Sequence, residues 1–349
     1  MTSYFYNMTL HFWDKLQLIK RSSLPRMLNA FKIWFSFAIS RTFMINWHWG
    51  APLAIAIEPT TACNLGCPEC PSGLRSFTRP TGNLKADFYR SVIDQMSKES
   101  FYLTFYFQGE PYINPHFLDM VEYANQANIY TATSTNAHFL NDENAKKTVE
   151  SGLDRLIISI DGTTQETYEN YRKGGQLSKV LEGTKNVVKW KKELKSKTPH
   201  LIFQFLVVKP NEHQIDEVYE LAKEYGVNEV KLKTAQLYEH EHGNPLMPSI
   251  DKYSRYKKNS DGTYSIKNSL DNHCWKLWHS CVITWDGRVI PCCFDKDAEY
   301  SMGELAEADF KSIWKGEAYR AFRKQLFKGR ENIEICRNCS EGTRVFSGS

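Results

Sequence analysis

The 349-residue sequence lacks several features that define other classes of protein. It contains no run of about 18 apolar residues, which excludes a membrane-spanning helix. Its N-terminus has no basic stretch followed by an apolar core and a cleavage site, so we expect no secretory signal and a cytoplasmic location. Basic residues number 44 and acidic residues 40, and this small excess does not predict a nucleic-acid-binding protein.

Cysteine is absent from the 203 residues between Cys70 and Cys274. The nine cysteines instead form two groups, and an odd number in a chain without an export signal disfavours a disulfide framework. Clustered thiols in a reducing compartment are typical of metal or cluster ligands. The first group is Cys63, Cys67 and Cys70. The second group contains six residues: Cys274, Cys281, Cys292, Cys293, Cys336 and Cys339.

Residues 1–50 are basic and aromatic, with Asp14 as the one acidic residue against six basic ones. Leu28, Phe31 and Phe35 recur at helical spacing, so we expect a helical extension. This extension either packs on the main domain, or lies on a membrane surface or a partner. The sequence leaves these alternatives open.

Short apolar segments alternate with polar segments of helical periodicity between residues 51 and 235. Strands that alternate with helices pair in parallel through right-handed crossovers. We therefore predict an α/β fold, a partial (β/α)6 barrel whose chemistry lies in the loops after the strands. The predicted strands are 53–58, 102–107, 129–134, 155–160, 202–208 and 229–233. The predicted helices are 84–98, 115–127, 142–151, 165–193 and 211–225.

Residues 236–270 are polar and rich in turn residues, which predicts a linker. His240 and His242 lie in this segment and are of metal-ligating type, but a solvated linker explains them better. The linker leads to a small C-terminal module at residues 271–349. A hairpin turn is predicted there at Asp286 and Gly287.

Cys63, Cys67 and Cys70 have the spacing C-x3-C-x2-C directly after the first predicted strand. Three thiolates can hold three corners of a cubane iron–sulfur cluster and leave the fourth iron open to another molecule. Structural zinc needs four closed ligands, usually from paired C-x2-C motifs, and fits this spacing less well.

This motif, placed after the first strand of a barrel, resembles the radical S-adenosylmethionine (radical SAM) superfamily. The resemblance implies that the open iron binds SAM, and that reductive cleavage of SAM yields a 5′-deoxyadenosyl radical that abstracts a substrate hydrogen atom. Polar motifs after the next strands resemble the SAM contacts of the family. The residues so implied are Gly109, Glu110, Ser134, Asn136, Ser159, Asp161 and Arg172. Glu110 would accept a hydrogen bond from the SAM amino group, and Arg172 would pair with the SAM carboxylate. The alternative for Arg172 is that it is a surface arginine.

The second group resembles the SPASM or twitch module of radical SAM enzymes, because Gly287 lies between two of its cysteines and a C-x2-C pair closes it. The resemblance implies a second, auxiliary 4Fe–4S cluster, with Cys281 and Cys293 as spare thiols. Structural zinc is the alternative. The implied ligands are Cys274, Cys292, Cys336 and Cys339. Sulfatase-maturating relatives carry an acidic base directly after such a cysteine, but here Asp295 comes two positions late, so no base is assigned.

The sequence therefore predicts a radical SAM oxidoreductase that dehydrogenates a sugar- or cyclitol-like small molecule and exchanges an electron with the auxiliary cluster. Modification of a ribosomally made peptide or protein is the alternative within this class. A non-catalytic metal-binding scaffold is the alternative outside it. The expected partners are a reductant such as flavodoxin or ferredoxin and a small-molecule or peptide substrate. A peripheral contact of residues 1–50 with a membrane is one of the two alternatives left open for that segment.

Overall fold

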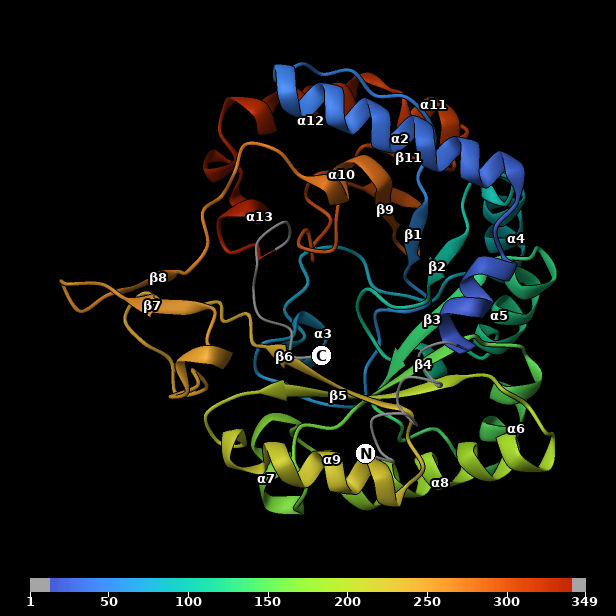
Figure 1. The fold of residues 1–349 in the computed structure, drawn as a ribbon, viewed down its shortest axis with the longest axis vertical. Coiled ribbons are helices and arrows are strands. Elements are labelled where there is room, and N and C mark those ends of the chain that lie inside the picture. The colour runs from blue at the N-terminus through green and yellow to red at the C-terminus, as the bar shows by residue number, and fades with distance from the viewer. Residues whose placement is uncertain (1–12, 341–349) are drawn as a thin grey trace.

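The computed structural model describes residues 13–340, and residues 1–12 and 341–349 lie outside the described part. Six parallel strands pair in chain order and curve into a barrel that does not close (Figure 1). This confirms the predicted fold class. The strands are β1 (Ala54–Ile57), β2 (Tyr102–Thr104), β3 (Tyr130–Thr135), β4 (Arg155–Ser159), β5 (His200–Val207) and β6 (Glu229–Thr234).

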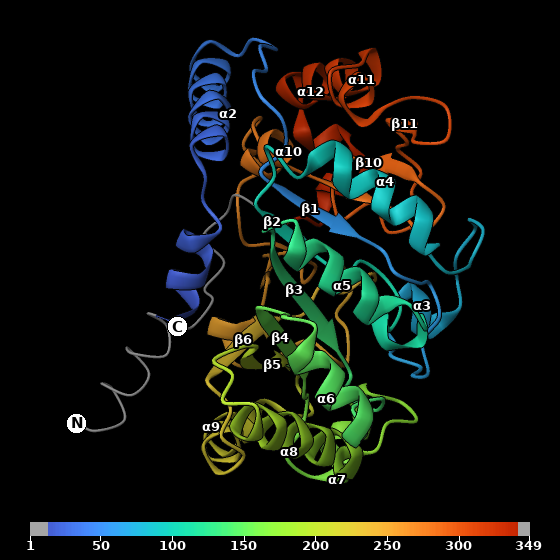
Figure 2. The ribbon, with the colours of Figure 1, turned by 90° about the vertical axis from the view of Figure 1, so that its right-hand side faces the viewer.

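Helices cover the outer face of these strands (Figure 2). Strand β5 is buried on both faces and accordingly reads as an apolar run, in which the adjacent Ile202 and Phe203 point to opposite faces and are both fully buried. The covering helices are α4 (Ala86–Met96), α5 (Phe117–Gln126), α6 (Asp142–Glu150), α7 (Gln165–Tyr171), α8 (Leu177–Glu193) and α9 (Ile215–Glu224).

The polar stretch predicted as one helix over 165–193 is two helices, α7 and α8. Thr164 caps the N-terminus of α7, where its side chain accepts a hydrogen bond from Thr167 N. The chain breaks after Tyr171, and Gly174 in the break has φ +76°, a left-handed conformation that glycine adopts without strain. The break turns the chain back toward the carboxyl ends of the strands.

The C-terminal region extends the barrel sheet instead of forming a separate layer. Strand β9 pairs in parallel with β1, with Ile283 opposite Ile57, and within residues 13–340 the sheet has nine strands. Gly287 has φ +91° in the β9–β10 turn, where the hairpin was predicted. The elements of this region are α10 (Trp275–His279), β9 (Ser280–Ile283), β10 (Arg288–Ile290), β11 (Gly303–Glu304), α11 (Phe310–Trp314), α12 (Glu317–Lys328) and α13 (Glu334–Arg337).

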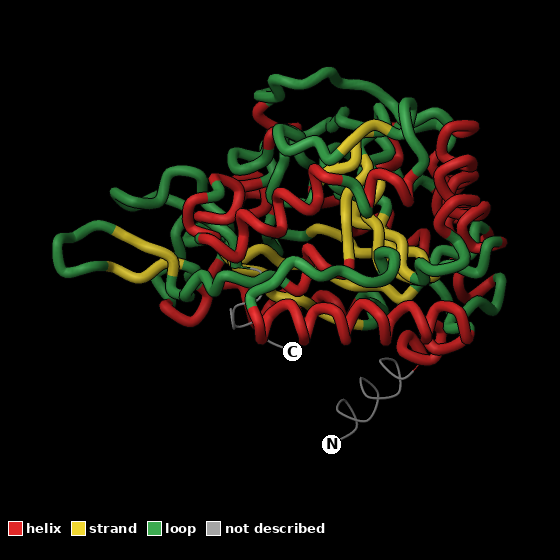
Figure 3. The backbone as a smooth tube through the Cα atoms, turned by 90° about the horizontal axis from the view of Figure 1, so that it is seen from above, coloured by secondary structure: helices red, strands yellow, loops and turns green. Residues whose placement is uncertain are grey.

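The segment predicted as a linker, residues 236–270, contains an antiparallel hairpin, β7 (Tyr256–Lys258) and β8 (Tyr264–Ile266). The hairpin projects from the side of the body (Figures 1 and 3). The His240 ring stacks on the buried Tyr256 with centroids 4.4 Å apart, so this histidine packs against the hairpin rather than lying free in a solvated linker.

Helix α2 (Leu24–Phe43) lies along the outside of the body, near the amino ends of β1 and β2 (Figures 1 and 2). No helix of residues 13–340 is long and apolar enough to cross a membrane.

Candidate iron–sulfur and SAM site

The three cysteines of the first group lie on the loop between β1 and the short helix α3 (Pro71–Leu74). All three line one cavity of about 230 Å³. Cys70 N donates to Cys67 O at 3.3 Å, and a Cβ at Gly73 would lie 2.5 Å from Cys67 N, so glycine permits this tight turn. Burial raises the pKa of Cys63 to about 11, so its thiolate needs a positive partner such as iron.

Glu110 lines the same cavity from the turn after β2. Its carboxylate accepts hydrogen bonds from Thr135 Oγ1 and Asn136 N, both at 2.7 Å. Burial raises the pKa of Glu110 to about 7, although these donors act to lower it. Gly109 has φ +74°, and a Cβ there would lie 2.3 Å from Thr60 O. Only glycine lets this turn approach the loop after β1 so closely.

Three predicted polar residues, Ser134, Asn136 and Ser159, reach the cavity from β3 and β4. Asn136 Nδ2 donates to Asn64 Oδ1 at 2.7 Å and lies 4.0 Å from Cys63 Sγ. The end of β3 is therefore tied to the cysteine loop. Direct contacts of these side chains with SAM stay predictions.

Arg172 lines the cavity from the break between α7 and α8. Its Nε donates to Asp161 Oδ2 at 2.5 Å, and its Nη1 lies 3.7 Å from Cys67 Sγ. The side chain is 17% exposed, so it is not a surface arginine.

Asp161 does not belong to the cavity wall. Its second carboxylate oxygen accepts from Leu206 N at 2.7 Å, and the residue is 1% exposed. Both oxygens of Asp161 are thus engaged by the protein, and its carboxylate positions Arg172. A direct contact of Asp161 with SAM stays a prediction.

The four thiols predicted as auxiliary ligands line a second, small cavity together with apolar side chains that include Leu277, Phe294 and Phe322. These thiols are Cys274, Cys292, Cys336 and Cys339. Arg330, which is buried, donates from Nη2 to Cys339 Sγ at 3.3 Å. A buried guanidinium beside thiolates balances the negative charge of a thiolate-ligated cluster.

Cys281 and Cys293 do not line the second cavity. Cys281 is buried on β9, and burial raises the pKa of its thiol. Cys293 packs against a separate apolar cluster around Val282 and Ile290.

Asp295, considered as a base from its position, is also buried. Its carboxylate accepts from Glu299 N and Tyr300 N at 2.8 and 2.9 Å, so it stabilises a turn.

In the described part of the chain, no three His, Cys, Asp or Glu side chains are arranged to hold one metal ion. The expectation here is a four-iron cluster, whose thiolates are separated by the width of the cluster. Whether each cavity suits its expected cofactor therefore depends on the groups that surround its thiols. In the first cavity three thiols face a carboxylate and a guanidinium, which suit the ammonium and carboxylate of SAM. In the second cavity four thiols face one space, which suits a fully ligated cluster.

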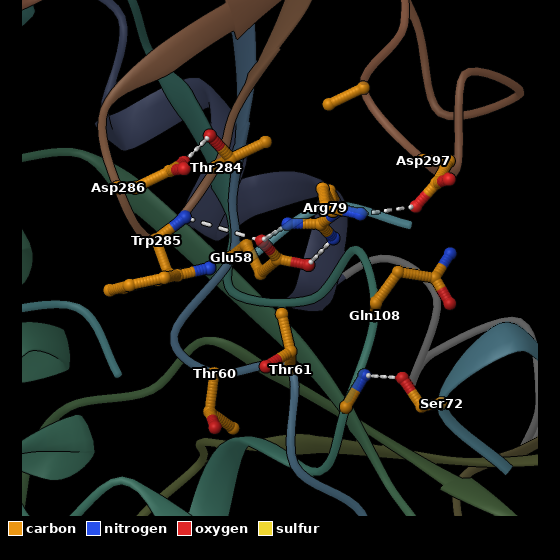
Figure 4. Close-up of polar contacts among 12 residues, drawn as sticks. Glu58, Thr60, Thr61, Ser72, Arg79, Gln108, Thr284, Trp285, Asp286 and Asp297 are labelled. Atoms are coloured by element: carbon orange, nitrogen blue, oxygen red, sulfur yellow. Dashed lines mark hydrogen bonds and ion pairs between the residues drawn. The ribbon is translucent and has the colours of Figure 1, made fainter. Parts of the chain in front are cut away.

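Sequence reasoning missed a buried ion pair beside the first cavity (Figure 4). Arg79 donates to both carboxylate oxygens of Glu58, at 2.9 and 2.5 Å, and both side chains are almost fully buried. Trp285 N donates to the same carboxylate at 3.2 Å from the β9–β10 turn. Asp297 accepts from Arg79 N at 3.4 Å. The pair therefore joins the barrel to the C-terminal region, and its one signal in the sequence is a carboxylate that ends an apolar strand.

Ser72 and Gln108 also line the first cavity and were not predicted. Gly109 N donates to Ser72 Oγ at 2.8 Å, and Gln108 Oε1 lies 3.9 Å from Cys70 Sγ. Both contacts join the β2 turn to the cysteine loop. They depend on tertiary packing, which no local motif reports.

Two family models match the chain. The model described as the radical SAM superfamily matches residues 57–222, and the model described as an iron–sulfur cluster-binding domain (SPASM) matches residues 274–340. A curated relative, the tungsten-containing aldehyde ferredoxin oxidoreductase cofactor-modifying protein of Pyrococcus furiosus, is 28% identical over 76% of this chain and 82% of its own length.

Two solved structures share the fold at lower identity. BtrN in complex with AdoMet and 2-DOIA has a TM-score of 0.52 and 17% identity, over 85% of this chain and 96% of that chain. SuiB of Streptococcus suis bound to S-adenosylmethionine has a TM-score of 0.62 and 14% identity, over 89% of this chain and 76% of that chain.

Proposed function

We propose a net oxidation for this chain, which belongs to the radical SAM superfamily and carries a SPASM iron–sulfur domain. The chain is an enzyme whose cofactors are a 4Fe–4S cluster, SAM and auxiliary iron–sulfur. The substrate that we propose is a sugar- or cyclitol-like alcohol. Bound together, these cofactors supply a 5′-deoxyadenosyl radical that removes a hydrogen atom from carbon and an acceptor for the remaining electron.

One observation carries this proposal: four thiols of the C-terminal region line a single cavity, while Cys281 and Cys293 face elsewhere. Four protein ligands would complete the coordination of one cubane cluster. A complete cluster has no open iron for substrate, so its use is electron transfer. An electron acceptor beside the site favours oxidation of the substrate over a redox-neutral rearrangement.

The oxidation of an alcohol also releases a hydroxyl proton, and the chain offers Lys296 to receive it. Lys296, three residues after Cys293, contacts Tyr238 Oη through Nζ at 3.0 Å. Tyr238 N donates to Glu69 Oε2 at 2.8 Å, and Glu69 precedes Cys70. This chain of contacts runs from one cysteine group to the other. Burial lowers the pKa of Lys296, so a larger share of its amine is unprotonated and able to accept a proton. The electron for SAM cleavage would come from a flavodoxin or a ferredoxin.

The test uses the full chain with both clusters reconstituted anaerobically, SAM and dithionite. Sugars, cyclitols and aminocyclitols deuterated at carbon are supplied one by one, and 5′-deoxyadenosine is analysed by mass spectrometry. We expect deuterium in 5′-deoxyadenosine together with a ketone that has two hydrogens fewer than the substrate. Deuterium transfer from peptides but from no polyol would contradict the proposed substrate class.

Lys296→Gln tests the proton acceptor. We expect this variant to cleave SAM but to form ketone at least about tenfold more slowly, and to lose the rise of the rate with pH. Lys257→Gln, at an exposed position of β7, is the matched control and should leave both rates unchanged. An unchanged pH profile in Lys296→Gln would remove this residue from the proposal.

A further inference from the structure

Helix α2 is turned with its polar face inward and its apolar face outward. Its buried positions are Arg26, Asn29, Ile33, Ser36 and Ser40, of which four are polar. A helix on the surface of a globular protein normally buries its apolar stripe. We name the exposed apolar surface of α2 and the following loop the aromatic platform, after six of its side chains: Met27, Phe31, Trp34, Phe35, Trp47 and Trp49.

Hydrogen bonds fix this orientation of α2. Arg26 donates to Ser97 O at 2.6 Å and to Asn128 O at 2.5 Å. Asn29 donates to Ala51 O and accepts from Ala51 N, both at 2.9 Å. These groups are buried, so rolling the helix to cover its apolar face would leave buried polar groups without hydrogen-bond partners, which is unfavourable.

The rings of the aromatic platform contact one another on the surface. Phe31 stacks on Phe35 with centroids 5.8 Å apart, Phe35 meets the edge of Trp47 at 5.9 Å, and Trp47 lies 6.3 Å from Trp49. Phe31 is 54% exposed and Trp34 is 56% exposed. Isolated exposed apolar residues need no explanation, but a contiguous aromatic patch marks an interaction surface.

The charge around the platform is positive. The sequence has no acidic residue between Asp14 and Glu58. Lys32 Nζ lies 5.3 Å above the Trp49 ring. A cavity of about 510 Å³ beside α2 is lined by Trp49 together with Lys32, Lys311 and Lys315, and Glu99 is the one acidic residue in its lining.

We propose that the aromatic platform docks on an anionic phospholipid bilayer, with α2 lying in the plane of the interface. Tryptophan and phenylalanine favour the boundary between headgroups and acyl chains, and nearby lysines favour anionic lipids. A second copy of the chain would bring like charges around Lys32 and Arg41 together, which disfavours self-association through this face. Self-association through this face is an outcome of the test below.

Docking in this way leaves the site open to substrate. The contacts of α2 with Ala51 and Ser97 place it at the amino ends of β1 and β2, whereas the cysteine loop follows the carboxyl end of β1. Figure 2 shows α2 and α3 on opposite sides of the strands. Membrane binding and SAM cleavage should therefore respond to different substitutions.

Vesicle flotation of the reconstituted full chain tests the proposal, with vesicles of phosphatidylcholine alone and vesicles of phosphatidylcholine mixed with phosphatidylglycerol. We expect binding to the mixed vesicles that weakens as salt is added. Phe31→Glu with Trp34→Glu should weaken it at least about tenfold and leave SAM cleavage unchanged. The matched control is Leu194→Glu with Tyr219→Glu, which changes exposed apolar residues at α8 and α9, across the molecule from α2 (Figure 1).

A second variant, Lys32→Glu with Arg41→Glu, tests the charge separately and should remove the preference for phosphatidylglycerol. Equal binding to both vesicle types would overturn the anionic-lipid assignment. Absence of the wild-type chain from the floating fraction would overturn the whole proposal. So would self-association, measured by analytical ultracentrifugation, that Phe31→Glu with Trp34→Glu abolishes.

Discussion

The buried pair of Glu58 and Arg79 gives a prediction whose size follows from the structure. Arg79→Met removes the cation and leaves the Glu58 carboxylate, which is 0% exposed, with Trp285 N as its remaining donor shown in Figure 4. Removing one partner of a buried ion pair costs about 3–5 kcal/mol, because the other charge stays desolvated and uncompensated. The unfolding entropy of about 2.1 cal/mol/K per residue gives about 0.7 kcal/mol/K for 349 residues. The expected fall in Tm is therefore about 4–7 °C.

The pH dependence of this variant separates a charge effect from a packing effect. Burial raises the pKa of Glu58 above its ordinary value, although Arg79 acts to lower it. Without Arg79 the pKa rises further. A carboxyl group with a raised pKa in the folded state favours folding at low pH, and this contribution is lost as the pH rises through the folded-state pKa. The deficit of Arg79→Met relative to wild type should therefore shrink as the pH is lowered.

Differential scanning fluorimetry of wild type, Arg79→Met and the double variant Glu58→Gln with Arg79→Met measures these effects. The double variant has no buried charge at this position, so it should recover most of the lost Tm. The reasoning is refuted if Arg79→Met lowers Tm by less than about 1 °C, or if the double variant is no more stable than the single one.

Three further outcomes follow from the two cavities. In the predicted SAM site, Glu110 would pair with the SAM ammonium only when it is ionised, and its pKa is raised to about 7. SAM affinity in equilibrium dialysis should therefore fall as the pH drops below about 7. Glu110→Gln should bind SAM at least about tenfold more weakly, with a flat pH profile. Gly109→Ala places a Cβ 2.3 Å from a carbonyl oxygen and should cost about 1–3 kcal/mol in thermal unfolding. Cys292→Ala should lose about four irons per chain in a colorimetric assay, whereas Cys281→Ala should keep them; equal iron content in both variants would contradict the ligand set.

Local patterns in the sequence were sufficient to predict the barrel, and the family resemblance pointed to several of the residues that line its cavity, but not to Ser72 or Gln108. Apolar runs that alternate with segments of helical periodicity identify the strands and imply that they pair in parallel. The carboxyl ends of parallel strands lie at one edge of the sheet. Cys63, Glu110 and Arg172 follow three different elements, yet they line one cavity for this reason.

The orientation of α2 could not be read from spacing alone. Leu28, Phe31 and Phe35 recur at a helical period, and such a stripe normally faces the core. The structure turns it outward, because Arg26 and Asn29 find backbone partners on the body that no hydrophobic pattern reveals. The helix therefore packs on the main domain, as one alternative held, but through the face opposite to the one that carries the pattern.

The contacts of the Asp161 side chain could not be predicted from a motif either. Its place after β4 suggests a side chain directed at a ligand, but Arg172 and Leu206 N come from other elements and engage both of its oxygens. Motifs report which residues reach an edge of the sheet. Which of two neighbours faces the ligand and which supports it depends on contacts between elements.

The pairing of β9 with β1 joins the regions that carry the two cysteine groups into one sheet. Ile283 lies opposite Ile57, Glu58 N donates to Ile283 O at 2.9 Å, and Cys292 follows β10 by two residues. The first cysteine group and Cys292 thus follow strands of one continuous sheet, β1 and β10, with β9 between them. The proposed electron transfer from a substrate radical to an auxiliary cluster would need a fixed separation. The continuous sheet and the Glu58–Arg79 pair at the junction would help to fix it, through hydrogen bonds that neither cysteine motif encodes.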